Sequence, residues 1–234
     1  MKVDYIGPAT VQMSTVEAAL VVHLCDKNGR PIEDTVPMIQ DVLANPSIIK
    51  AGVGIDLDML ELVRYWESSN KDICGRFDMG GIGGSNGRTM SLKNLAKGIL
   101  GVDLFKSKKL AMSNWGSVPL TSKQIDYAAR DAWAAAAIVQ ELGRRDAKMY
   151  SPQSLMDLVA PDEISMKEMD VRARARKDAK TQFFNIVGKG DNKVDRKDLS
   201  EEQLVEMDRL QGAMKKLAPP RYYRFDVEHL GIKF

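Results

Sequence analysis

The chain has 234 residues, of which 44% are hydrophobic and 28% are charged, and its formal net charge is +2. These values are ordinary for a soluble globular protein and leave room for one domain of about 150 residues with an extension. The sequence holds no apolar run of about 18 residues, and its start, MKVDYIGPATVQ, lacks the basic and apolar regions of a signal peptide. We therefore expect an intracellular protein, nuclear or cytoplasmic, with no membrane segment.

Cysteine and histidine are too sparse to support two common kinds of site. The chain contains only Cys25, Cys74, His23 and His229 of these types. Their scatter argues against a structural zinc site, and without a secretion signal both cysteines are predicted to be reduced thiols. Because His23 lies inside an apolar strand pattern, a Ser-His-Asp site is also poorly supported.

The first part of the chain alternates predicted strands and helices. These are two antiparallel strands (9–15 and 18–25), a helix (36–45) and a buried strand (47–55). Asp56, Asp58 or both then begin an amphipathic helix, because acidic side chains at a helix start are favoured by the helix dipole.

The next stretch, DMGGIGGSNGR (78–88), is rich in glycine. It lacks the lysine and the strand–turn–helix setting of a phosphate-binding P-loop, so we predict a flexible loop. The following segment, SLKNLAKGILG (91–101), predicts a helix with Ser91 as its N-cap and Gly101 as its C-terminal stop.

A long helix is predicted from the capping box of Thr121 and Gln124 to about Arg145. Tyr127 and Asp131 are one turn apart on this helix, so their side chains share a face. Alanines around them permit close packing, and the carboxylate could hold a metal ion while the tyrosine bonds a neighbouring water. The pair alone does not decide the matter, since alanine-rich helices with a single aspartate are common.

Residues 149–234 are predicted to form a helical extension of the α/β domain, 1–148. A charged, helix-prone run spans 164–187, and Ser200 with Gln203 forms a second capping box. The two predicted helices make a hairpin that carries no obvious chemistry.

Basic residues gather between positions 88 and 109, where Asp103 is the only acid. They are Arg88, Lys93, Lys97, Lys106, Lys108 and Lys109. Such a patch could contact nucleic-acid phosphates, although a solvated helix face and loop is an equally ordinary explanation.

Two segments, GVGIDLD (52–58) and SNWGSVPLTSKQIDYAARDA (113–132), resemble motifs of the DEDDy-type 3′-5′ exonuclease domains. This family includes the exonuclease domain of the Werner syndrome helicase and ribonuclease D. The resemblance covers residues 9–145, and its most specific part is the SNW…YAARD run. It implies an α/β fold, with a ribonuclease H-like mixed sheet flanked by helices.

The resemblance also implies a reaction and its cofactors. DNA or RNA 3′ ends would be hydrolysed with two Mg²⁺ or Mn²⁺ ions, which stabilise charge on the attacking and leaving oxygens. Asp131 would bind the cation that activates water, Asp58 would serve the other cation, and Tyr127 would orient the water. A helicase, fused or acting in trans, is an implied partner. Without the resemblance, Asp58 is equally well explained as a helix-start acid.

The family's first motif, an Asp-x-Glu on the first strand, has no counterpart in MKVDYIGP (1–8), where Asp4 is the only acid. We therefore expect an N-terminally truncated sheet, two of four carboxylates missing, and weak or absent hydrolysis by this chain. The favoured explanation is that the sequence is incomplete; another is that MKVDYI takes the strand position without its acids, and little hydrolysis is expected in each case. A further alternative is a non-catalytic nucleic-acid-binding or scaffold module of the same fold. An unrelated α/β protein would require the SNW…YAARD match to be chance.

Overall fold

The computed structural model describes residues 7–28, 30, 32, 36–66, 72–83, 89–159, 164–217, 225, 227–232 and 234. The chain divides into two compact units, residues 1–163 with 222–234, and residues 164–221. Each unit is described by itself. Among the helices that the structure describes, none is both long enough and apolar enough to cross a membrane.

The first unit contains two small sheets. Strands β1 (Thr10–Ser14) and β2 (Ala19–His23) pair antiparallel, as their sequence pattern predicts. Strands β3 (Lys50–Gly52) and β4 (Arg76–Asp78) pair in parallel. Within the described ranges these are two separate two-stranded sheets rather than one continuous mixed sheet.

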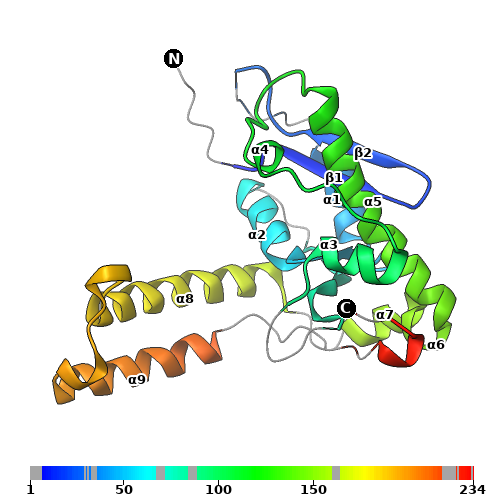
Figure 1. Ribbon diagram of the computed structural model, residues 1–234. Helices are drawn as coiled ribbons and strands as arrows, with labels where there is room; N and C mark the ends of the chain where they lie inside the picture. Colours follow the sequence, from blue (N-terminus) through cyan, green and yellow to red (C-terminus); the bar gives the residue numbers. More distant parts are fainter. Residues whose placement is uncertain are drawn as a thin grey trace. The chain divides into compact units, whose positions relative to one another are not determined.

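Helices make up most of the first unit (Figure 1). They are α1 (Val36–Ala44), α2 (Ile55–Tyr65), α3 (Leu92–Leu95), α4 (Lys108–Ala111), α5 (Ser122–Arg145), α6 (Ala147–Tyr150) and α7 (Pro152–Val159). The π-helical segment η3 (Ala96–Leu100) continues α3, and η2 (Met79–Gly81) and η7 (Glu228–Leu230) are short 3-10 turns. Helix α5 contacts β1, β2 and β3, so one helix packs on both sheets. Its buried face, which includes Ala134, Ile138 and Leu142, contributes to the core of the unit.

The glycine-rich stretch differs from the predicted flexible loop. Its first residue, Asp78, ends strand β4, and Met79–Gly81 form a buried turn. The side chains of Met79 and Ile82 are fully buried in the core. The glycines between them have no side chains, so the backbone itself can pack into the interior. The remainder of the predicted loop, residues 84–88, lies outside the described residues.

The C-terminal segment returns to the core of the first unit. The amide of Gly83 donates to the carbonyl of Phe225 at 3.0 Å, and Ile82 forms a parallel bridge with Phe225. The ring of Phe225 packs against Phe77 and Tyr150, with centroids 5.5 Å and 5.6 Å away. These contacts close the core over the turn that follows β4.

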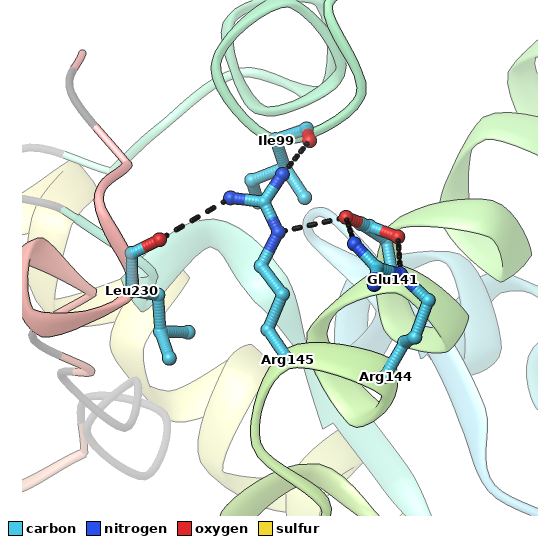
Figure 2. A network of polar contacts seen from close by, with 5 residues as sticks. All are labelled: Ile99, Glu141, Arg144, Arg145 and Leu230. Carbon is cyan, nitrogen blue, oxygen red and sulfur yellow. Dashed lines mark hydrogen bonds and ion pairs between the residues drawn. The ribbon is translucent and has the colours of Figure 1, made fainter.

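A polar network fixes the C-terminal end of α5 (Figure 2). Glu141 accepts hydrogen bonds from Arg144 and Arg145. Arg145 also donates to the carbonyl oxygen of Ile99 at 3.0 Å and to that of Leu230 at 3.4 Å. Because both arginines bond to it, the pKa of Glu141 falls from 4.5 to about 2.

Replacing Glu141 by Gln is expected to remove a pH-dependent contribution to stability. Between pH 4.5 and about 2, the folded chain binds fewer protons at Glu141 than the unfolded chain does. The contribution is therefore present above pH 4.5 and is lost as the pH falls toward 2. Urea unfolding of the native chain and of Glu141→Gln should show a difference in unfolding free energy at neutral pH that becomes smaller in acid and in high salt. A difference that changes with neither pH nor salt would contradict this origin.

The second unit consists mainly of two helices, α8 (Met166–Val187) and α9 (Glu201–Lys216), that pack against each other. The connection between them contains the short turns η5 (Gly190–Asn192) and η6 (Arg196–Asp198). The predicted capping box of Ser200 and Gln203 forms with both of its hydrogen bonds. A small apolar cluster of Val187, Leu199 and Met207 joins the helices to their connection.

Candidate active site

Tyr127 and Asp131 lie together on α5, as their spacing predicts. Burial, followed by the nearby negative charge of Asp131, raises the pKa of Tyr127 above its ordinary value of 10. Tyr127 therefore remains a neutral phenol near neutral pH, on the same face of α5 as the carboxylate.

A lysine from another segment reaches the same carboxylate. The Nζ atom of Lys106 lies 3.5 Å from Oδ2 of Asp131, and these side chains are 39% and 22% exposed. Lys106 stands in the irregular stretch before α4, in a position that the sequence suggested only for binding phosphate. The structure thus brings Lys106, Tyr127 and Asp131 into one polar cluster.

The SNW run is tied to the start of α5. The capping box of Thr121 and Gln124 forms as predicted. Gln124 is buried, and its amide also donates to the hydroxyl of Ser113 and to the carbonyl of Asn114, both at 3.1 Å. The ring of Trp115 lies 6.1 Å from that of Tyr127, measured between centroids. Gln124 therefore does more than cap the helix, because it also holds the segment that packs beside Tyr127.

The two acids in the first turn of α2 have different surroundings. Asp56 accepts a hydrogen bond from the buried guanidinium of Arg76 at 2.8 Å, so it serves as a structural partner. Asp58 has no ion-pair partner among the side chains that the structure describes. Although Asp58 is exposed overall, protein atoms around its carboxyl group raise its pKa, as does the nearby charge of Asp78. Asp58, rather than Asp56, is thus available to bind a ligand.

Asp78 is a buried acid whose role the sequence reasoning missed. Its carboxylate accepts from the amide of Gly54 at 2.9 Å and from that of Gly80 at 2.8 Å. Burial raises its pKa in spite of these hydrogen bonds. Gly54 caps α2 in a left-handed conformation, φ 76°, and has no side chain of its own to supply a cap. Asp78 therefore fixes the turn from which the helix carrying Asp58 begins.

The predicted basic patch is only partly available to phosphates. Lys93 forms an ion pair with Asp103 at 3.2 Å, and Lys106 is engaged by Asp131. Lys97, Lys108 and Lys109 are exposed, while Arg88 lies outside the described residues.

The donor chemistry of the cluster suits a hard cation. Carboxylate oxygens are the ligands that Mg²⁺ and Mn²⁺ prefer, so Asp131 can serve as a ligand, although the ammonium of Lys106 beside it opposes a second positive charge. In the part of the chain that the structure describes, no three Asp, Glu, His or Cys side chains group together as a metal site. Residues 1–6, which include Asp4, are not among those residues. The described residues therefore fit a cation at Asp131 but do not form a closed two-ion centre.

Comparison with known proteins identifies the family. Residues 9–145, more than half of the 234-residue chain, match the 3′-5′ exonuclease family, and the chain belongs to it. This span includes both sheets and the Tyr127–Asp131 cluster.

Individual relatives match parts of the chain. The mouse (Mus musculus) bifunctional 3′-5′ exonuclease/ATP-dependent helicase WRN is 40% identical over 102 residues, which are 44% of this chain and 7% of that protein. Mouse exonuclease 3′-5′ domain-containing protein 2 is 36% identical over 119 residues, 49% of this chain and 17% of the relative. A crystal structure of the EXD2 exonuclease domain soaked in Mn is 29% identical, covers 60% of this chain and 71% of its own, and has a TM-score of 0.26. The chain thus spans far less than half the length of either curated relative.

Proposed function

We propose that this protein acts on DNA or RNA 3′ ends as a phosphodiester hydrolase that uses two divalent cations, Mg²⁺ or Mn²⁺. The complete fold would then be a ribonuclease H-like sheet flanked by helices. The observation that carries the proposal is the cluster on α5, where a half-buried carboxylate, a phenol and an ammonium meet. Family membership over residues 9–145 supports it.

Asp131 and Tyr127 on α5 and Asp58 on α2 have proposed parts in the reaction. Asp131 would hold one cation and Asp58 the other, while the neutral Tyr127 hydroxyl orients the attacking water. The ions, when bound, would supply charge stabilisation at the attacking and leaving oxygens. Exposed Lys97, Lys108 and Lys109, with Arg88, would contact the substrate backbone.

We further propose that hydrolysis by this chain is weak. Only two of the expected carboxylates, Asp58 and Asp131, are present among the described residues, and no group of three potential ligands forms there. The same observation favours a second candidate, a non-catalytic nucleic-acid-binding or scaffold module. In either role a helicase is the proposed partner, and the nucleus or cytoplasm is the proposed compartment.

The proposal is tested with the full chain, Mn²⁺ and a labelled duplex that has a recessed 3′ end. We expect slow release of nucleotides that Asp131→Ala reduces to background. Asp126→Ala is the matched control, because Asp126 lies on the same helix but pairs with Arg130 in an exposed position. Binding without release would favour the non-catalytic candidate. Release unaffected by Asp131→Ala would contradict the assigned site, and rapid release abolished by it would contradict the expected weakness.

A further inference from the structure

Asp131 and Lys106 form an ion pair that differs from most others in the first unit. Several described pairs join residues within one helical turn, such as Arg64 with Glu61. The pair of Lys106 and Asp131 instead connects an irregular segment to the middle of α5. The same carboxylate lies one helical turn from Tyr127, so the ammonium stands inside the candidate active site.

The backbone on either side of Lys106 is anchored. Leu104 is buried, with 4% of its surface exposed. Ser107 caps α4 by accepting from the amide of Leu110 at 3.3 Å. An anchor on each side limits how far the chain can carry Lys106 from Asp131, even though the lysine side chain is long.

We propose that Lys106 is a positioning residue that acts through Asp131: its ammonium is an internal counter-cation that a divalent ion must displace. The proposal rests on the proposed function, because that function places a cation at Asp131. A divalent ion at this carboxylate would meet a positive charge a few ångströms away, and the repulsion lowers its affinity. Lys106 thereby sets how readily the site takes up metal and keeps Asp131 neutralised when no metal is bound.

The measurement is Mn²⁺ binding to the full chain, followed by the electron paramagnetic resonance signal of free Mn²⁺, with no nucleic acid present. Lys106→Met removes the charge and keeps the length and apolar stem of the side chain. Lys93→Met is the matched control, since it removes one charge from another ion pair, that with Asp103. We expect Lys106→Met to bind Mn²⁺ roughly three- to tenfold more tightly than the native chain, and Lys93→Met to differ by less than about twofold.

The outcomes separate this inference from the proposed function. Equal affinity for the two lysine variants, or no detectable binding even by Lys106→Met, overturns the inference. Binding by Lys106→Met alone supports it. If Asp131→Ala binds Mn²⁺ as tightly as the native chain, the cation lies elsewhere and the assigned site fails instead. Circular dichroism of each variant confirms that the fold is intact.

Discussion

Asp78→Ala is expected to destabilise the first unit by about 2–4 kcal/mol. The substitution leaves the amides of Gly54 and Gly80 without their acceptor, and each buried amide left unsatisfied costs about 1–3 kcal/mol. It also removes the only side chain that holds the left-handed Gly54 cap of α2 in the described structure. The substitution also removes a carboxylate whose charged form is disfavoured by burial, as its raised pKa shows, and this offsets part of the loss.

Urea unfolding followed by tryptophan fluorescence measures this effect directly, because Trp66, Trp115 and Trp133 all lie in the first unit. Asp78→Asn keeps one acceptor oxygen and should lose less stability than the alanine variant. Asp103→Ala is the control at an exposed acid, with an expected change within about 0.5 kcal/mol. An unfolding midpoint for Asp78→Ala that matches this control would show that the two amides find other partners.

Gly188→Ala is expected to destabilise the second unit by about 2–3 kcal/mol. Gly188 ends α8 with φ 69° and ψ −180°, a region that is essentially open only to glycine. A Cβ atom there would lie 1.9 Å from the carbonyl oxygen of Asn192, so the backbone of the α8–α9 connection would have to move. The apolar cluster of Val187, Leu199 and Met207 spans this connection and would loosen with it.

Gly212→Ala is expected to have the opposite effect and to stabilise the same unit. Gly212 lies inside α9, and a Cβ atom there would meet no atom within 4 Å. Alanine should therefore stabilise the helix by about 0.5–1 kcal/mol. Hydrogen exchange of the α8 and α9 amides measures both changes, while tryptophan fluorescence from the first unit should stay the same. Equal protection in the two variants would contradict the strained role of Gly188.

Local signals in the sequence predicted the helices well. The capping boxes at Thr121 and Ser200 both form, and α5 ends at the predicted Arg145. Tyr127 and Asp131 lie one turn apart on α5, so they share a face of that helix as predicted. Each of these features depends on groups within about one helical turn, which is why the sequence alone is enough to predict them.

Other features were decided by packing between segments that are distant in the sequence. The stretch predicted as a flexible loop after Asp78 begins as buried structure, because Phe225 closes over it from the far end of the chain. Asp78 accepts a hydrogen bond from the amide of Gly54 at the start of α2. Lys106, which the sequence suggested for binding phosphate, pairs with Asp131 instead. Periodicity and spacing do not predict these contacts, because the contacts depend on how the folded backbone brings distant side chains together. Local sequence patterns thus predicted the residues proposed for the chemistry, whereas packing between distant segments set which charges surround those residues.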